Sequence, residues 1–196
     1  MKLSAVLLTG VLAAATVPAG ESSFRDAFVA SAPVPERRAM RGDWNIAEGV
    51  ARCTQDDLLY KKYKNHGPIL FYDFPTTDAT FRCVVKPTGC QSLVFTLNGT
   101  GGHVFRLIAR AKGTTLLAFP PDSEKPVETG SRPEWKLREG EWTEIVVTLK
   151  GSKAIVSLAG REPITVEHDT YGTPKVNFSV GFAFGTLEVK GIEVAK

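Results

Sequence analysis

No stretch of the 196-residue sequence carries apolar residues at sustained helical spacing, although residues 23–30 and 56–63 could form a turn or two. Amphipathic helices require that spacing, so its absence excludes a helical bundle and a parallel α/β fold. Instead, at least ten short segments are rich in β-forming residues, many with alternating apolar and polar positions, and turn residues separate them. This pattern predicts an all-β, two-sheet antiparallel β-sandwich or jelly roll.

The sequence also has little excess of one sign of charge over the other. The 24 Lys and Arg residues nearly balance the 21 Asp and Glu residues, and the net charge is +3. The basic residues are scattered along the chain rather than gathered in a dense stripe. Because nucleic-acid-binding surfaces normally show a basic patch or stripe, we expect no nucleic-acid partner.

Only one long apolar run is present, directly after Lys2 at the N-terminus. It is shorter than the roughly 20 apolar residues that a membrane-spanning helix needs. Val17 and Ala19 then supply small residues at the spacing of a signal-peptide cleavage site. We therefore expect residues 1–19 to be removed and residues 20–196 to form a single domain. The domain would be exported, periplasmic or secreted, with no membrane insertion after removal of the signal.

Cysteine is the next scarce residue, with Cys53, Cys83 and Cys90 only. Disulfides persist in exported proteins, and an odd count leaves at least one thiol unpaired. Cys83 and Cys90 flank the turn-like segment 86–89, KPTG, so we expect a disulfide between them and a buried Cys53. The alternative is that all three are buried thiols. A zinc site would need a fourth ligand and a closely spaced cysteine pair, and neither is evident.

Residues 141–160, EWTEIVVTLKGSKAIVSLAG, predict a β-hairpin. Gly151-Ser152 suits a two-residue turn with glycine first. Folding there brings six apolar side chains to one face, so turn chemistry and alternation agree on the register. The predicted pairs are Leu149 with Ala154, Val147 with Val156, and Ile145 with Leu158.

Two later features extend the strand pattern. Residues 175–185, KVNFSVGFAFG, place five apolar side chains on one face, which is typical of a central strand packed on another layer. In the last segment the facing of the apolar residues changes at Gly191, where a β-bulge would restore it. Residues 119–135 predict a long, polar, Pro-rich loop.

Four segments together resemble a known family: DWNIAEGVARC, FYDFPTTDATFRCVVKP, GEWTEIVVTLKGSKAIVSLAGR and VGFAFGTLEVKGIEVAK. They resemble strand pairs of the concanavalin A-like lectin/glucanase β-sandwich, and the nearest relatives are the bacterial 3-keto-disaccharide hydrolase domains, with laminin-G-like modules as cousins. In the third segment Ala159 stands where the family usually has Asn. The resemblance covers most of the chain after residue 19, and it implies the sandwich fold.

The middle of the chain departs from that family. Its enzymes carry an N-S-G-x-x-x-R stretch and a Glu-centred E-x-Q-x-x-D stretch there, whereas this chain has no acidic residue between Asp78 and Asp122. Glycoside cleavage generally needs two carboxylates about 5–10 Å apart. The resemblance therefore implies the fold without implying a catalytic site.

The candidate ligand-binding residues are Trp135, Arg106, Arg82, His103 and Asn98. Trp135 follows the polar loop, where an exposed indole could stack on a sugar ring; the alternative is packing at the sheet edge. The arginines and His103 lie on or near the middle strands, and a face mixing charged with apolar groups suits a ligand groove. The alternative is a solvated face with packed aliphatic stems. Asn98 lies in the turn segment NGTGG.

We expect no cofactor, although Asp56-Asp57 leaves a calcium site open as an alternative. The leading functional prediction is an exported, non-catalytic domain that binds a glycan or cell-surface polysaccharide. One alternative is a glycoside-processing hydrolase of the 3-keto-disaccharide hydrolase type. The other is a structural envelope domain without a ligand.

Overall fold

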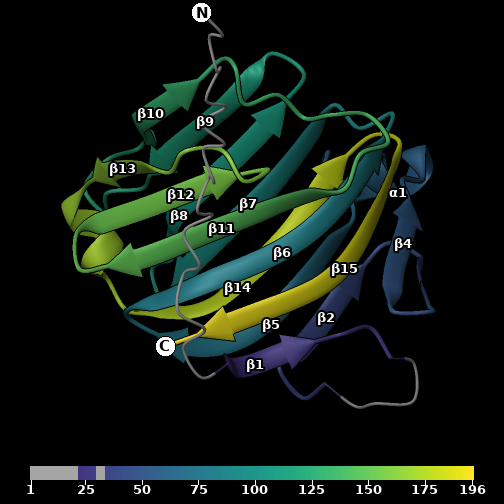
Figure 1. The fold of residues 1–196 in the computed structure, drawn as a ribbon, viewed down its shortest axis with the longest axis horizontal. Helices are drawn as coiled ribbons and strands as arrows, with labels where there is room; N and C mark the ends of the chain where they lie inside the picture. The colour runs from purple at the N-terminus through teal and green to yellow at the C-terminus, as the bar shows by residue number, and fades with distance from the viewer. Residues whose placement is uncertain (1–21, 30–33) are drawn as a thin grey trace, which may run out of the picture.

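A computed structural model describes residues 22–29 and 34–196, so the predicted signal peptide lies outside the described residues. Two antiparallel sheets pack face to face, as the sequence predicts (Figure 1). Within the described residues the first sheet has eight strands, in the order β13-β12-β11-β6-β15-β4-β3, with β1 also pairing with β15. These strands are β1 (Ser22–Asp26), β3 (Trp44–Ala47), β4 (Val50–Thr54), β6 (Ala79–Thr88), β11 (Thr143–Lys150), β12 (Lys153–Leu158), β13 (Ile164–Glu167) and β15 (Thr186–Ala195).

The second sheet has seven strands in the described part of the chain, in the order β10-β9-β8-β7-β14-β5-β2. These are β2 (Arg37–Arg41), β5 (Ile69–Thr76), β7 (Ser92–Gly99), β8 (Gly102–Arg110), β9 (Gly113–Ala118), β10 (Val127–Arg132) and β14 (Lys175–Ala183). Helical structure in the described residues is confined to α1 (Asp57–Lys62) and the 3₁₀ turn η1 (Asp169–Gly172). None of these residues forms a helix long and apolar enough to cross a membrane.

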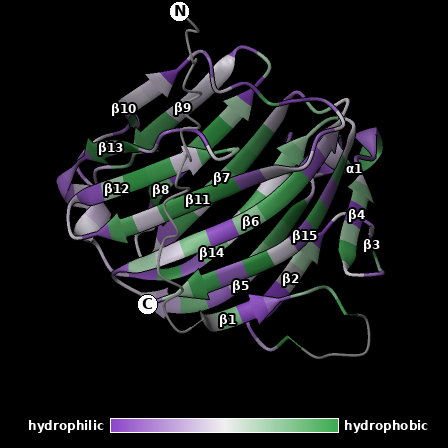
Figure 2. Ribbon diagram, viewed as in Figure 1, coloured by the Kyte–Doolittle hydropathy of each residue, from purple (hydrophilic) through white to green (hydrophobic). Residues whose placement is uncertain are grey.

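The core lies between the two sheets. Along β6 every second residue from Ala79 to Pro87 is buried, and apolar and polar residues alternate along many strands in Figure 2. Phe81 of the first sheet meets Phe178 of the second with ring centroids 5.3 Å apart, and Tyr72 stacks on Phe178 at 5.0 Å. Such aromatic pairs stabilise the fold beyond the area they bury, and the Phe81–Phe178 pair links the two sheets.

Local predictions hold well. The β11–β12 hairpin has the predicted pairs, including Ile145 opposite Leu158. Strand β14 lies inside the second sheet between β7 and β5, and the register of β15 shifts at Gly191, as a bulge there requires. A helical turn forms at α1, as residues 56–63 allow.

Two local expectations are wrong. Residues 22–26 form strand β1 rather than a helical turn, because they pair with the end of β15. The Pro-rich segment 119–135 contains strand β10, which pairs with β9 at the edge of the second sheet. The partner of β1 comes from the far end of the chain, and β10 pairs with the preceding strand across the loop between them. Local periodicity does not report either partner.

Candidate functional site

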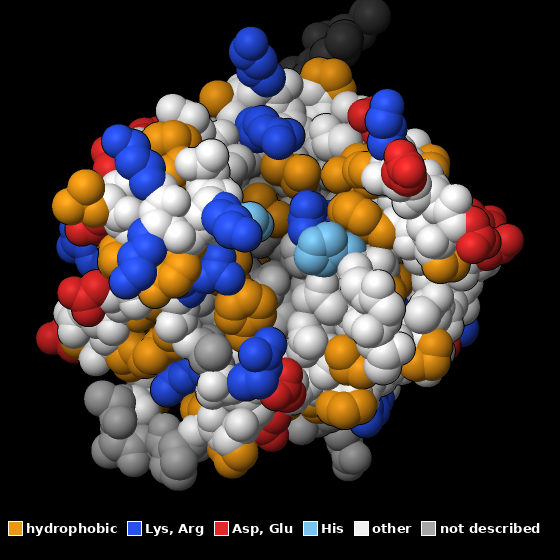
Figure 3. All heavy atoms as spheres, turned by 180° about the vertical axis from the view of Figure 1, so that it is seen from behind, with side chains coloured by type: hydrophobic (Ala, Val, Ile, Leu, Met, Phe, Trp, Pro, Cys, Tyr) orange, Lys and Arg blue, Asp and Glu red, His pale blue; other side chains and the backbone are white. Residues whose placement is uncertain are grey.

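A groove of about 740 Å³ crosses the outer face of the second sheet. Its floor comes from β7, β14 and β5, one side from β8, and the other from β2 and the segment after α1. Figure 3 views the molecule from this side and shows a central hollow bordered by Arg, Lys and His side chains. We call this feature the groove.

Strand alternation places a polar floor in the groove. On β7, Leu93, Phe95 and Leu97 are buried in the core, so Thr96 and Asn98 face outward. On β14, Asn177 lies opposite Asn98 and Ser179 opposite Thr96. The floor therefore presents paired amides and hydroxyls, groups that can both donate and accept hydrogen bonds.

Gly181 keeps the floor low at the β5 side. A Cβ at this position would lie 2.9 Å from Cγ1 of Ile69 and 3.1 Å from the Pro68 carbonyl oxygen, closer than ordinary contact. A side chain would push β5 away, so glycine is the residue that permits this approach.

A bulge between β7 and β8 brings His103 onto the groove face. Leu97 pairs with Phe105 whereas Asn98 pairs with His103, which leaves Val104 as an extra residue. Val104 and Phe105 are consecutive buried residues for this reason. Without the bulge, His103 and Arg106 would face opposite sides of the sheet, since an odd separation along a strand changes the face.

The result is a hydrogen-bonded chain of side chains, which we call the polar network. Asn98 Nδ2 donates to Asn177 Oδ1 at 2.7 Å, and Asn98 Oδ1 lies 2.6 Å from His103 Nδ1. His103 Nε2 lies 2.6 Å from Arg106 Nη2, and Arg106 Nε donates to Thr96 Oγ1 at 3.1 Å. Five side chains from three neighbouring strands, β7, β8 and β14, are thereby fixed relative to one another.

These contacts determine the tautomer of His103. Arginine has only donors, so His103 Nε2 must accept from Arg106. The Nδ1 atom then carries the proton and donates to the Asn98 oxygen. Burial lowers the pKa of His103 below its ordinary value of 6.5, and the charges of Arg106 and His66 lower it further. His103 is thus held neutral, as its acceptor role requires.

Cationic side chains line the opposite side of the groove. Arg38 Nε donates to Asp73 Oδ1 at 2.8 Å, and its guanidinium lies over the Phe71 ring at 5.1 Å from the centroid. Arg41 lies over the rings of Phe71 and Tyr63, at 5.9 and 5.4 Å. Such cation–π contacts hold arginines in place while leaving their N–H groups available.

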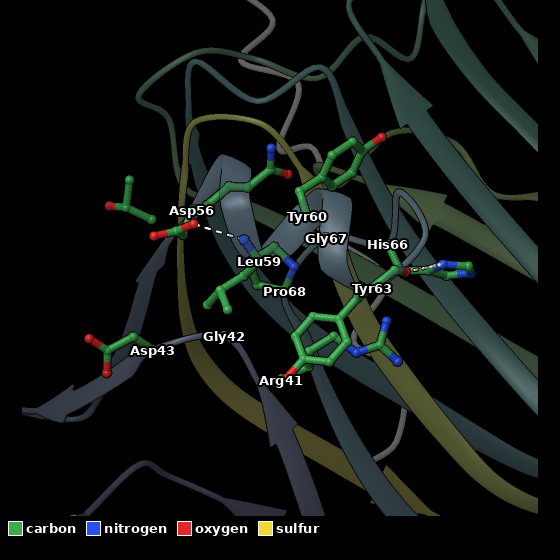
Figure 4. Close-up of a pocket in the computed structure, with 12 residues that line it drawn as sticks. Arg41, Gly42, Asp43, Asp56, Leu59, Tyr60, Tyr63, His66, Gly67 and Pro68 are labelled. Atoms are coloured by element: carbon green, nitrogen blue, oxygen red, sulfur yellow. Dashed lines mark hydrogen bonds between the residues drawn. The ribbon is translucent and has the colours of Figure 1, made fainter.

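A smaller hollow of about 410 Å³ adjoins the groove and shares Arg41, Tyr60, His66 and Gly67 with it. Figure 4 shows this side pocket between α1 and the segment Arg41–Asp43, with the Tyr63 ring beside the Arg41 guanidinium. His66 Nδ1 lies 2.9 Å from the Tyr63 carbonyl oxygen, which folds the segment after α1 against the helix end.

Three of the predicted ligand-binding residues, Asn98, His103 and Arg106, come together in the polar network. Arg82 does not join them. It lies on β6 in the first sheet, where its guanidinium bonds Glu144 of β11. Alternation along β6 correctly predicts that Arg82 lies on the face away from the core. However, β6 belongs to the first sheet, whereas the groove lies on the second.

Trp135 is not a sugar platform. Its side chain is only 3% exposed and belongs to the core, and its carbonyl oxygen accepts from Thr114 Oγ1 at 2.6 Å. An indole stacks on a ligand only through an open ring face, and this ring has none. Trp142, by contrast, is 37% exposed, with Lys86 and Lys190 over its ring.

The Cys83–Cys90 disulfide prediction is also wrong, because all three cysteines are free. Strand β6 continues without a turn from Cys83 to Thr88. Five residues of extended strand span about 16 Å, far beyond the roughly 7 Å between Cα atoms that a disulfide tolerates. Cys90 lies past that end of the strand, with its thiol 3.0 Å from the Thr186 carbonyl oxygen.

The acidic pair considered for calcium has other roles. Asp56 Oδ1 accepts from the backbone N–H groups of Leu58 and Leu59, which caps α1. Asp57 accepts from Gln55 Nε2 at 3.2 Å. Across the described ranges no group of three His, Cys, Asp or Glu side chains is placed to hold a metal ion.

Sequence reasoning missed Asn177, Arg38 and Arg41 as groove residues. For Asn177 a signal existed, since it lies on the polar face of the predicted central strand. Its partner Asn98 comes from β7, 79 positions earlier, and alternation gives no information on which strands become neighbours. Arg38 and Arg41 lie on an edge strand too short for a clear pattern.

Comparison with known proteins yields structural relatives only. No protein-family model matches the chain, and no curated protein does. The carbohydrate binding module CBM66 from Bacillus subtilis has a TM-score of 0.59 at 8% identity, covering 80% of this chain and 92% of its own. A Congerin II single mutant has a TM-score of 0.52 at 7% identity, covering 62% of this chain and 95% of its own. Alginate lyase A1-II', a member of polysaccharide lyase family-7, has a TM-score of 0.51 at 10% identity, covering 66% of this chain and 70% of its own.

Identities this low establish the fold alone. The narrower resemblance to 3-keto-disaccharide hydrolase domains stays a prediction. Together, the sheet order and these matches show that the chain forms a concanavalin A-like, two-sheet antiparallel jelly-roll sandwich.

Proposed function

We propose that this domain binds a carbohydrate in the groove and does not cleave it. The polar network carries the proposal. It fixes amide, imidazole and guanidinium groups on a rigid sheet, and preorganised polar groups lose little entropy on binding. Sugar hydroxyls both donate and accept, and they match groups of this kind. Structural similarity to the carbohydrate binding module CBM66 supports the same proposal.

Cleavage has little support in the groove, because the residues that line it include no Asp or Glu. Asp73 lies on the same face but is bonded to Arg38. The hydrolase alternative rests on Asp43 and Asp56, which line the side pocket. Asp56 already caps α1, so this pair is a poorer acid and base than two free carboxylates.

The test is a glycan panel measured by calorimetry on residues 20–196, the mature chain that the sequence predicts. We expect Kd values of roughly micromolar to millimolar, equivalent to about −8 to −4 kcal/mol. Asn98→Ala removes the central hydrogen bonds of the polar network and should weaken binding by roughly tenfold. The matched control is Asn45→Ala, an exposed asparagine on β3 of the first sheet, which should leave binding unchanged.

A chromatographic assay for cleavage of ordinary and 3-keto disaccharides belongs beside the panel. Turnover that disappears in Asp43→Asn would replace the binding proposal with the hydrolase. No binding to any glycan would leave the structural envelope domain as the remaining function.

A further inference from the structure

The charge of the groove is one-sided. The residues that line it include Arg38, Arg41, Arg106, His66 and His103 and no carboxylate. Arg38 is neutralised by Asp73 on the adjoining strand β5. Arg41 and Arg106 take part in none of the ion pairs found among residues 22–29 and 34–196.

Arg106 is a half-buried cation whose partners are all uncharged. Its guanidinium contacts the Thr96 hydroxyl and neutral His103, and lies 5.1 Å from the centroid of the Phe119 ring. Desolvation lowers the pKa of Arg106, yet arginine remains protonated in proteins. A partly desolvated cation without a counter-ion attracts an anion more strongly than a solvated one does.

Arg41 supplies a second unneutralised cation at a distance. Arg106 lies on β8 and Arg41 on β2, and the strands β7, β14 and β5 separate them. Four steps between neighbouring strands at ~4.8 Å each place these two strands about 19 Å apart. Between them lies the floor of amides and hydroxyls, so the groove presents cation, neutral polar floor and cation in succession.

We propose that the ligand of the groove is an acidic polysaccharide, with one anionic substituent at Arg106 and another at Arg41. This inference rests on the proposed carbohydrate function and specifies its substrate class. The anionic group is a carboxylate or a sulfate ester, and arginine can bind either through two parallel N–H donors. Uncharged ring hydroxyls of the sugar units between them lie over Asn98 and Asn177.

A single-stranded nucleic acid is the competing anionic polymer. Such ligands bind mainly by stacking their bases on open aromatic rings. Three aromatic residues line the groove. Phe71 has Arg38 and Arg41 over its ring, Phe182 is buried, and the Tyr60 ring packs on Phe184. The floor also carries amides and hydroxyls that can donate and accept hydrogen bonds, which favours the sugar polymer.

The experiment measures binding of long oligouronates, sulfated oligosaccharides, neutral oligosaccharides of equal length, a uronic acid monosaccharide and single-stranded DNA. We expect a long acidic oligosaccharide to bind at least roughly tenfold more tightly than its neutral counterpart, as hydrogen bonds to charged groups predict. Binding should weaken as salt rises. The monosaccharide should bind weakly, because it reaches only one cation.

Variants separate specific contacts from net charge. Arg106→Gln and Arg41→Gln should each weaken binding of the acidic oligosaccharide by roughly tenfold, and the double variant by about the product, since the sites are far apart. Arg82→Gln removes the same charge from the first sheet and should leave binding unchanged. Binding of a neutral glycan should change much less in Arg41→Gln than binding of the acidic one.

The outcomes are distinct. Equal affinity for neutral and acidic oligosaccharides would overturn the substrate class and leave the proposed function intact. Tighter binding of DNA than of every glycan would overturn it in favour of a nucleic acid. Binding of uronates only, or of sulfated sugars only, would identify the source of the anion and support the inference. No glycan binding at all would overturn both proposals.

Discussion

At the scale of single residues, His103 is the residue whose charge state the polar network depends on. Protonation would turn its Nε2 from an acceptor into a donor facing the donors of Arg106. Burial and the neighbouring charges lower the pKa of His103 in the folded state. Between that pKa and about 6.5, the unfolded chain therefore binds more protons than the folded chain, and stability rises with pH through this window.

We predict that the free energy of unfolding falls as pH drops below about 6.5, and that part of this fall disappears in His103→Gln. Urea unfolding at several pH values measures it. His168→Gln is the control, and the fall should persist there. A wild-type and a His103→Gln curve that stay parallel from pH 7 to about pH 5 would contradict the lowered pKa.

Burial also protects the three cysteine thiols from alkylation. Burial raises the pKa of Cys53 and of Cys90 to about 11 and that of Cys83 to about 12. Alkylating reagents attack the thiolate, which these values suppress at neutral pH. We predict that iodoacetamide labels the native protein slowly, at Cys90 first, and labels all three cysteines in denaturant. Mass spectrometry measures this, and a Cys83–Cys90 linked peptide without reductant would disprove it.

At the scale of elements, the two sheets are tied at one edge by a buried carboxylate. Asp26 on β1 accepts from Arg37 Nη1 of β2 and from Tyr72 Oη of β5, both at 2.9 Å, and also from the backbone N–H of Phe28. β1 belongs to the first sheet, whereas β2 and β5 belong to the second. One side chain thus joins both layers.

We predict that Asp26→Ala lowers the free energy of unfolding by about 3–5 kcal/mol, since it leaves the Arg37 cation and the Tyr72 hydroxyl without their partner. Arg25→Ala, which breaks the exposed Arg25–Glu193 pair at the adjacent position, should change it by about 0–1 kcal/mol. Denaturant melts of the two variants provide the comparison. Equal effects would show that the buried pair does not stabilise the fold more than the exposed one.

The elements also show what the sequence can and cannot predict. The β11–β12 register was predictable because a two-residue turn and six alternating apolar residues are local, and Gly191 revealed its bulge for the same reason. The His103 bulge was not predictable: strict alternation puts Val104 on the same face as Arg106, whereas Val104 is buried beside Phe105. Both registers satisfy the apolar pattern, and pairing with β7 decides between them.

Sheet membership was the second limit. Alternation tells which residues of a strand share a face, but not which sheet the strand joins. Arg82 and Arg106 therefore looked alike in sequence, although they lie on opposite layers. The prediction of an exposed Trp135 was wrong for a related reason. Its sequence neighbours are polar, but the backbone turn that buries it depends on contacts with β9, such as the Thr114 hydrogen bond.

At the scale of the whole molecule, the two outer faces differ in how their charges are balanced. On the first sheet, three cations are paired with carboxylates across neighbouring strands, in Arg82–Glu144, Lys86–Glu188 and Arg25–Glu193. On the second sheet, Arg41 and Arg106 have no such partner among the described residues. The small net charge of +3 therefore conceals a local excess of positive charge in the groove, which attracts anions.

Export determines which ligands such a face can meet, and it stays a prediction from the sequence. Cleavage after Ala19 would leave only Gly20 and Glu21 before β1, whose Ser22 pairs with Ala195 of β15. We therefore expect the mature chain to keep the whole sandwich, and cleavage further along, inside β1, to be unfavourable because it would remove that pairing. Intact-mass measurement of protein from the native host, fractionated into cytoplasm, periplasm and medium, tests this. The expected mass is that of residues 20–196, outside the cytoplasm. A folded, cytoplasmic protein that retains residues 1–19 would contradict export and remove extracellular polysaccharides from the ligands available to the groove.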